Sequence, residues 1–456
     1  MLFPTFTFIL GFLPLTTLVY FLLAKKNITA SRVWLLAASF VFYSWFNWSY
    51  SLILAGSILM NWFFAQMLLR CKSKIILTLG ILCNVFLLGY FKYYDFFIEN
   101  LNLFFGTSFL LKHILLPLGI SFFTFQQISF LQQVYSRTLE KRYSFLSYAL
   151  FVSFFPQLIA GPIVLPDEMM SQFDKLENSR PDADNIARGI YVFSLGLAKK
   201  ILLADFFAMI ANYGFNTLND NFFVAWQTAL AYTFQIYFDF SGYCDMAIGI
   251  ALIFNICLPK NFDAPYRSAD ISEFWRRWHI TLGRFLMSAI YIPLGGNRVG
   301  KFRTCCNLFI TFFISGLWHG ASWLFVLWGV LHGGALIIHR IWNKFLSLSM
   351  PVWLGRVLTF FFVVICWVLF RAETLAQVKG IYKGMFCPAS WELPPLPPFN
   401  YCLFAAGFII ILFLPTVSTL EKRFKPTWIN AVTAIALLVT CMFLFVKYSP
   451  FIYFNF

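Results

Sequence analysis

The chain contains five histidines, and His319 is the one whose surroundings most favour chemistry. It lies in the apolar stretch Phe313-Ile-Ser-Gly-Leu-Trp-His-Gly-Ala-Ser-Trp-Leu-Phe, next to Trp318, where Gly316 and Gly320 allow close backbone approach. An ionisable side chain at membrane depth needs a partner, a water-filled cavity or a function. We interpret His319 either as a catalytic group or as a core histidine satisfied by a backbone carbonyl.

The other histidines do not complete a metal site with His319. His319 and His332 are thirteen residues apart, which places them on roughly opposite faces of one continuous helix. His332 and His339 share a face, but two ligands make no site, and no carboxylate or thiolate spacing completes one. The ten cysteines are scattered and form no Cys-x-x-Cys pair. We therefore predict no metal site and no disulfide framework.

A second candidate histidine, His279, lies in the motif Phe274-Trp-Arg-Arg-Trp-His-Ile-Thr-Leu, together with Trp275, Arg276 and Arg277. Tryptophan and arginine crowd in this way where a helix is fixed at a membrane interface. The same residues could form a cationic, aromatic mouth that delivers an anionic substrate to a histidine behind it. The sequence leaves both interpretations open.

Two carboxylates, Asp239 and Asp245, interrupt another apolar run, and Ser241 and Gly242 lie between them. This pattern predicts a broken or re-entrant helix whose carboxylates cap the backbone or pair with arginine. A substrate contact by Asp239 is the alternative.

Two lysines, Lys199 and Lys200, are adjacent in the motif Gly196-Leu-Ala-Lys-Lys. They are interpreted either as interfacial anchors or as contacts for a phosphate. Both interpretations place them near the aqueous boundary.

All of these residues belong to a chain that must lie largely in a membrane. Of its 456 residues, 60% are hydrophobic and 12% are charged, and the mean hydropathy is +0.74. Soluble domains carry about 25% charged residues, so a soluble domain, a disordered chain and a collagen-like fibre are excluded. The net charge of +15 comes from short basic clusters at the ends of apolar runs, which indicates membrane topology and not nucleic-acid binding.

Apolar stretches of spanning length recur along the whole chain. In the first part we predict a retained N-terminal span, not a signal peptide, and four more spans, at residues 1–23, 33–48, 51–69, 75–91 and 115–134. Later stretches lie at residues 189–213, 223–258, 306–338, 353–370, 401–414 and 429–445. The prediction is an all-α polytopic membrane protein with about 10–12 transmembrane helices, re-entrant pieces and short interfacial helices.

Basic clusters predict the orientation of the chain. With four alternating crossings, three clusters fall on one side, namely Lys25 and Lys26, then Arg70, Lys72 and Lys74, then Arg137, Lys141 and Arg142. The positive-inside rule assigns that side to the cytoplasm and the N-terminus to the outside.

We predict a single integral membrane domain over residues 1–456. It would comprise N-terminal helices (1–164), an acidic polar loop (165–188), catalytic core helices (189–345) and C-terminal helices (346–456). A rigid extended loop before the last helices is indicated by five prolines, Pro388, Pro394, Pro395, Pro397 and Pro398.

Eight motifs in one order carry a resemblance to a known family. They are Phe154-Phe-Pro-Gln-Leu-Ile-Ala-Gly-Pro, Gly196-Leu-Ala-Lys-Lys, Tyr237-Phe-Asp-Phe-Ser-Gly-Tyr, Phe274-Trp-Arg-Arg-Trp-His-Ile-Thr-Leu, Tyr291-Ile-Pro-Leu-Gly-Gly-Asn-Arg, Leu317-Trp-His-Gly-Ala-Ser-Trp, Phe370-Arg-Ala and Ser449-Pro-Phe-Ile-Tyr-Phe. The chain resembles the membrane-bound O-acyltransferases, most closely the bacterial branch typified by the membrane subunit of alginate O-acetyltransferase.

The resemblance implies a helical body around a central tunnel, in which His319 is catalytic and His279 lies across from it. His319 would be the general base for an acceptor hydroxyl, and its burial would keep it neutral. His279 would orient the acceptor or stabilise the developing oxyanion. The substrate-binding candidates are Trp275, Arg276, Arg277, Lys199, Lys200, Asp239 and Trp318.

The resemblance also implies the reaction and its setting. Acetyl-CoA would be the donor, no cofactor would be bound, and an exported or cell-surface polysaccharide would be O-acetylated. The protein would lie in the bacterial inner membrane as a multi-pass protein, and an extracytoplasmic esterase-like partner would complete the transfer. Three alternatives stay open: D-alanyl or other acyl transfer to an envelope polymer, a small-anion transporter, and an inactive scaffold.

Two departures from the family pattern stand out. Leu286-Met-Ser-Ala replaces the family's Phe-Arg-Asp-Tyr, so that Met287 and Ser288 replace an arginine and an aspartate, and Gln133 replaces a second aspartate. The three lost charges could have formed one buried ion-pair network, whose loss as a set costs little stability. Alternatively, they bound donor, acceptor or partner in the relatives, and this protein's substrate differs.

Overall fold

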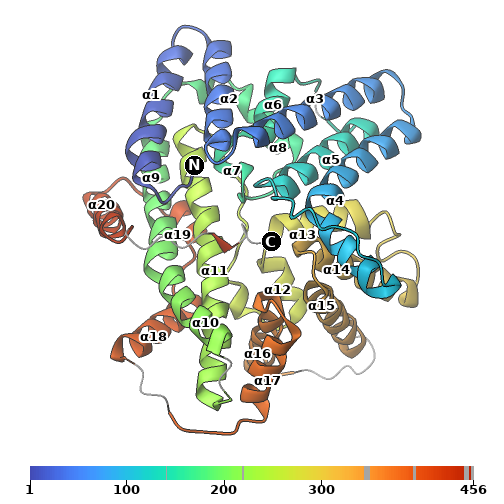
Figure 1. The fold of residues 1–456 in the computed structure, drawn as a ribbon. Helices are drawn as coiled ribbons and strands as arrows, with labels where there is room; N and C mark the ends of the chain where they lie inside the picture. Colours follow the sequence, from blue (N-terminus) through green and yellow to red (C-terminus); the bar gives the residue numbers. More distant parts are fainter. Residues whose placement is uncertain (140, 218–219, 344–349, 394–396, 446–450, 453–456) are drawn as a thin grey trace. The chain divides into compact units, whose positions relative to one another are not determined.

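The computed structural model describes residues 1–139, 141–217, 220–343, 350–393, 397–445 and 451–452, which form helices joined by loops (Figure 1). No β-strand occurs in these ranges, apart from an isolated bridge between Asn221 and Ser390. The predicted all-α polytopic membrane fold is confirmed.

Six helices of the described chain are long and apolar enough to cross a bilayer, at Thr7–Ala24, Trp48–Arg70, Lys74–Phe105, Phe222–Ile253, Trp323–Ile341 and Val352–Arg371. Shorter apolar helices lie at Ile28–Ser44, Ile280–Tyr291, Pro398–Leu412 and Trp428–Phe443. The total number of crossings stays a prediction.

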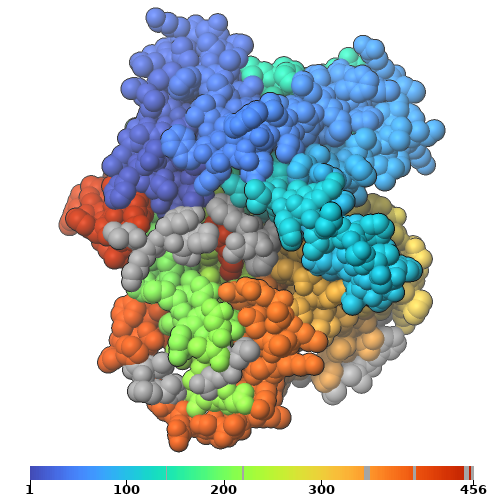
Figure 2. Space-filling view, in the orientation of Figure 1, coloured from blue at the N-terminus to red at the C-terminus, as the bar shows by residue number. Residues whose placement is uncertain are grey.

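The chain divides into two compact units, each assembled from separate stretches of sequence. The first unit contains Met1–Leu195, Tyr243–Pro259 and Phe424–Phe445. Its helices are a π-helical turn Thr7–Phe12 followed by α1 (Leu13–Ala24), α2 (Ile28–Ser44), α3 (Trp48–Arg70), α4 (Lys74–Phe105), α5 (Ile120–Ser136), α6 (Phe145–Ser153), α7 (Phe155–Leu158), α8 (Pro166–Phe173), most of α9 (Ala183–Ala198) and α20 (Trp428–Phe443). Figure 2 shows α1 and α2 in dark blue at the surface of this unit.

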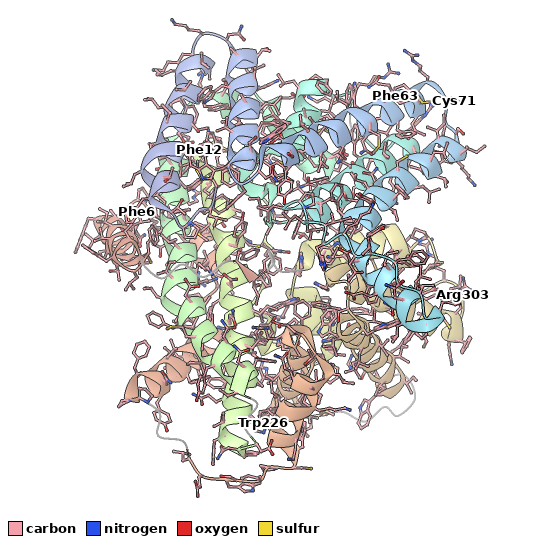
Figure 3. All side chains as sticks on the ribbon, in the orientation of Figure 1. Phe6, Phe12, Phe63, Cys71, Trp226 and Arg303 are labelled. Carbon is pink, nitrogen blue, oxygen red and sulfur yellow. The ribbon has the colours of Figure 1, made fainter. Side chains whose placement is uncertain are left out.

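Side-chain caps start two helices of the first unit, and buried amides join one of its helix pairs. Asn27 and Asn47 accept backbone N–H groups at the starts of α2 and α3. Between α3 and α4, the buried amides of Asn61 and Asn84 donate to each other at 3.1 and 2.6 Å. Phe63 on α3 and Cys71 just beyond its end point outward (Figure 3), and both are exposed.

α4 is longer than a membrane requires. Its 32 residues make a helix of about 48 Å, against about 30 Å for the hydrocarbon core. Near its C-terminal end, the Asp95 carboxylate accepts the backbone N–H groups of Lys112 at 2.7 Å and Ile114 at 3.2 Å. These bonds hold the loop that follows α4 against the helix.

The second unit contains Gly196–Gly242 and Lys260–Arg423, with the described residues Phe451 and Ile452. Its helices are a π-helical turn Lys199–Ala204, α10 (Asp205–Thr217), the first part of α11 (Phe222–Ile253), α12 (Ile271–Arg277), α13 (Ile280–Leu286), α14 (Lys301–His319), α15 (Trp323–Ile341), α16 (Val352–Arg371), α17 (Leu375–Phe386), α18 (Pro398–Leu412) and α19 (Val417–Lys422).

α11 corrects the prediction of a broken helix, because it runs without interruption through Asp239, Ser241 and Gly242. Gly242 allows close packing: a Cβ there would lie 2.7 Å from the carbonyl oxygen of Gly196. The polar residues are tolerated because they have partners within the unit. Gly242 and Asp239 thus mark contacts of α11 with other segments of the unit, not a helix end.

The proline-rich segment ends where α18 starts. Pro397 is the N-cap of α18 and Pro398 its first residue, a position at which the missing N–H costs nothing. The predicted extended loop also includes Pro394 and Pro395, which lie outside the described residues, as does Ser449 of the last motif.

Candidate active site

A tightly packed helical hairpin positions His319. α14 ends at His319, and α15 begins after Ser322, whose side chain accepts the N–H of Leu324. A Cβ on Gly316 would overlap the carbonyl oxygen of Phe325, and one on Gly329 would overlap that of Phe312. The two helices therefore pack backbone against backbone, as Figure 1 shows for this pair. His319 stands at the turn of a rigid hairpin.

The imidazole of His319 is enclosed by aromatic rings. Ring centroids lie at 4.7 Å for Trp318, 5.0 Å for Trp328 and 5.0 Å for Phe370, each in an edge arrangement. His319 is 3% exposed. Such a setting disfavours imidazolium and suits a neutral imidazole.

His279 lies at a sharp corner between α12 and α13, in the left-handed region with φ 45° and ψ 52°. Its Nδ1 is 3.1 Å from Oδ1 of Asn261, and its ring is 4.8 Å from Phe240 and 6.1 Å from Trp318. α12 and α13 are each too short to span a bilayer. Burial lowers the pKa of the His279 imidazole to about 3, so it is neutral at physiological pH.

Trp318 links the two predicted histidines. Its indole contacts His319 at 4.7 Å and His279 at 6.1 Å between ring centroids, and it is 5% exposed. The structure therefore brings together His279, His319 and Trp318 from two separate motifs, within one unit.

A third histidine, His332, joins this cluster from α15. The indole N–H of Trp275 donates to its Nδ1 at 3.2 Å, and its ring lies 4.7 Å from Trp328. His319 and His332 do not lie on opposite faces of one continuous helix, as the sequence had predicted, because the chain turns between them and both rings contact Trp328. Within the described residues, no group of three His, Cys, Asp or Glu side chains could hold a metal ion.

The two arginines of the same motif have different surroundings. Arg277 donates to the carboxylate of Glu273 at 2.7 and 3.0 Å and to the carbonyl of Asp263 at 3.1 Å. Arg276 is exposed. The side chain of Arg277 thus fixes α12 to the preceding loop, and Arg276 is the better candidate for an anionic substrate.

Lys200 is buried inside the protein, which neither the anchor nor the phosphate-contact interpretation had predicted. It is 4% exposed, and its ammonium lies 2.8 Å from Asp205 and 2.9 Å from Asp239. Asp239 also accepts the backbone N–H of Ile452 at 2.7 Å. These contacts give Asp239 and Lys200 a structural role, and the partner of Asp239 is a lysine where an arginine was predicted.

Lys199 is placed differently from its neighbour. Its ammonium is 3.4 Å from the Ser241 hydroxyl and 5.8 Å from the centre of the Tyr237 ring, and the residue is half-buried. A role in binding donor phosphates therefore stays a prediction for Lys199 and is no longer expected of Lys200.

The positions that depart from the family pattern are mostly exposed. Met287 and Ser288 are exposed, and the Ser288 hydroxyl donates to the carbonyl of Phe285 at 3.0 Å. Gln133 is half-buried on α5, in the other unit.

Sequence reasoning missed four residues that shape the site, namely Asn261, Phe240, Trp328 and Phe370. Asn261 is the most informative, since it is 1% exposed and its side chain contacts His279. A lone asparagine between a lysine and a phenylalanine carries no spacing signal. Trp328, nine residues after His319, could have been found only by recognising the hairpin.

Comparison with known proteins identifies the family. The model of the membrane-bound O-acyltransferase family matches residues 40–376. A peptidoglycan O-acetyltransferase of Helicobacter pylori is 43% identical over 519 residues, which cover 100% of this chain and 98% of the relative. A probable alginate O-acetylase of Pseudomonas aeruginosa is 39% identical over 424 residues, 91% of this chain and 80% of the relative.

A more distant similarity covers about half of the chain. A teichoic acid D-alanyltransferase of Streptococcus thermophilus is 29% identical over 255 residues, 52% of this chain and 59% of the relative. The expected resemblance is confirmed by the family match and by the full-length relatives. The buried histidines that contact one indole therefore lie in a chain that belongs to the membrane-bound O-acyltransferase family and is an acyltransferase.

Proposed function

We propose that this protein transfers an acetyl group from acetyl-CoA towards a hydroxyl of a cell-envelope glycan, and that the glycan is peptidoglycan. The observation that carries the chemistry is the pair of buried histidines, His279 and His319, whose rings both contact the indole of Trp318. The choice of glycan is supported by the peptidoglycan O-acetyltransferase that matches the chain over its whole length.

The reaction needs a general base and a site that aligns the thioester with the acceptor hydroxyl. A thioester is already activated, so the enzyme must hold it against a hydroxyl and accept one proton. His319 takes the proton as the hydroxyl oxygen bonds to the carbonyl carbon. The carbon–sulfur bond then breaks, and the leaving thiolate takes the proton from His319 to become the free thiol, which returns the imidazole to its neutral form. The exposed Arg276 and the half-buried Lys199 are the candidates for the donor's phosphates.

The hydroxyl that attacks belongs either to the glycan or to an extracytoplasmic esterase-like partner that passes the acetyl group on. The inner membrane is the site at which cytoplasmic acetyl-CoA and an external acceptor can both be reached. No step of the proposal requires a bound cofactor.

A reconstitution experiment tests the chemistry. Protein in proteoliposomes is given radiolabelled acetyl-CoA and soluble peptidoglycan fragments, and thioester loss is followed for the wild type, His319→Ala, His279→Ala and the control His339→Gln. Loss of a positioned base predicts a fall of about 10²- to 10⁴-fold for His319→Ala. Acetyl-CoA consumption that is unchanged by His319→Ala overturns the assignment.

A cellular experiment tests the acceptor. A strain without the protein is complemented with the wild type or His319→Ala, and base-released acetate is measured in purified peptidoglycan and in other surface polysaccharides. Acetate that returns to peptidoglycan only with the wild type supports the proposal. Acetate that returns only to another polymer refutes the choice of glycan and leaves the acyltransferase intact.

A further inference from the structure

Asn261 connects the start of α13 to the side chain of His279. Its backbone carbonyl accepts the N–H of Ile280 at 2.9 Å, and its side-chain oxygen accepts the N–H of Thr281 at 3.2 Å and the hydroxyl of Thr281 at 2.9 Å. His279, the N-cap residue, makes no side-chain cap of its own. Asn261 therefore caps α13 from a preceding segment.

These bonds identify which atom of the amide faces His279. A backbone N–H can only donate, so the side-chain atom facing Thr281 must be the carbonyl oxygen and not the amide nitrogen. The same oxygen lies 3.1 Å from Nδ1 of His279. An oxygen without a hydrogen requires a donor opposite, so the proton of the neutral imidazole is on Nδ1 and the lone pair is on Nε2.

The other ring nitrogen belongs to an imidazole that packs against aromatic side chains. Nε2 of His279 is buried and has no hydrogen-bond partner among the described residues, and the ring contacts those of Phe240 and Trp318. Because burial lowers the pKa of His279, Nε2 does not acquire a proton at physiological pH. It can accept a hydrogen bond and has none to donate.

We propose that Asn261 is a positioning residue that holds His279 in the Nδ1–H tautomer, so that Nε2 accepts a hydrogen bond from a second O–H or N–H group of the acyl acceptor, while the reacting hydroxyl donates to His319. The second half of this inference rests on the proposed function, and the tautomer rests on the geometry alone. Of the two roles considered for His279, orientation of the acceptor is retained. Stabilisation of the oxyanion is excluded, because an oxyanion needs a donor.

His332 provides an internal comparison, because its neutral imidazole is held in the other tautomer. The indole N–H of Trp275 donates to its Nδ1, so its proton is on Nε2. Two buried histidines of the same unit are thus held in different tautomers by one amide oxygen and one indole N–H. A spectroscopic method that distinguishes the two ring nitrogens should resolve both.

Nitrogen NMR tests the tautomer without any assay of activity. The full chain is labelled with ¹⁵N-histidine in detergent micelles, and the His279 and His332 signals are assigned by their loss in His279→Gln and His332→Gln. We expect a protonated Nδ1 and a bare Nε2 for His279 and the reverse for His332. A protonated Nε2 on His279 in the wild type overturns the proposal, whatever the variants do.

Variants test the role of Asn261. Asn261→Leu removes the accepting oxygen, and we expect mixed tautomers and a kcat lower by about 100-fold, with KM for acetyl-CoA unchanged, because the acceptor is misplaced. Asn261→Asp keeps an oxygen at the same position and should restore the tautomer. Thr281→Val removes one bond to the same oxygen, leaves the His279 bond, and serves as the matched control.

The outcomes separate the two proposals. The predicted tautomer with no acetyl transfer by any form refutes the proposed function alone. Acetyl transfer at the wild-type rate by Asn261→Leu with a scrambled tautomer refutes the positioning role alone. If Asn261→Leu fails to fold, the wild-type NMR spectrum still tests the tautomer of His279. The kinetics of Asn261→Asp then test the positioning role of Asn261.

Discussion

At the scale of single residues, Lys200 is a charge held inside the protein by two carboxylates. With side-chain exposures of 5% for Lys200, 14% for Asp205 and 2% for Asp239, the three groups have little water to solvate them. Burying charges is costly, and their mutual attraction offsets the cost only while all partners are present. The contribution of this cluster is therefore to fix the π-helical turn Lys199–Ala204 against α11.

Replacing Lys200 alone should strongly destabilise the folded protein. Lys200→Met leaves the two carboxylates facing each other without a cation, and we expect a loss of about 3–5 kcal/mol in the free energy of unfolding. Thermal unfolding in detergent measures this, with Lys199→Met as the control of similar sequence position. Lys200→Met combined with Asp239→Asn should recover part of the loss, and a Lys200→Met protein as stable as the wild type would contradict the argument.

Individual residues also show what sequence can and cannot reveal. His319 was predictable because an isolated histidine in an apolar stretch requires an explanation. The burial of Lys200 was not predictable, since adjacent lysines usually mark an interface. Asn261 was not predictable either, because its bond to His279 joins residues eighteen positions apart across a corner of unusual backbone conformation.

At the scale of elements, the α14–α15 hairpin sets where His319 stands. Gly316 and Gly329 let the two backbones meet, and this close approach leaves no room for a side chain at either position. Any outward displacement of α15 would move Trp328 and open the enclosure around His319.

A matched pair of substitutions tests the hairpin. Gly316→Ala should lower both thermal stability and acyl transfer, because its Cβ would overlap the carbonyl oxygen of Phe325. Gly334→Ala on the same hairpin has open space around the new methyl group and should be neutral or stabilising by up to about 1 kcal/mol. Equal effects of the two substitutions on unfolding temperature and acetyl-CoA turnover would refute the packing argument.

Most helices could be predicted from apolar length alone, since α3 and α16 begin and end within a few residues of the predicted spans. α11 was predicted as broken because local polarity resembles a helix end, whereas its Gly242 serves a distant contact. The predicted stretch 306–338 is two helices, because the turn after His319 is made by Gly320, Ala321 and Ser322 without proline or charge.

At the scale of the whole molecule, the orientation in the membrane is open to test at Cys71. This cysteine is exposed just after α3, beside Arg70 and Lys72, which the positive-inside rule assigns to the cytoplasm. We expect a membrane-impermeant maleimide to label Cys71 in opened vesicles and not in intact cells, as read by peptide mass spectrometry. Labelling in intact cells would reverse the predicted topology.

The surplus length of α4 has a consequence for the outer face of the membrane. A rod about 18 Å longer than the hydrocarbon must lean strongly or protrude, and Asp95 and Glu99 in its last third favour protrusion. In the predicted orientation this end emerges outside the cell, braced by the loop that Asp95 fastens. We expect this end to stand above the outer leaflet as a rigid helix, which gives the outer surface a fixed projection.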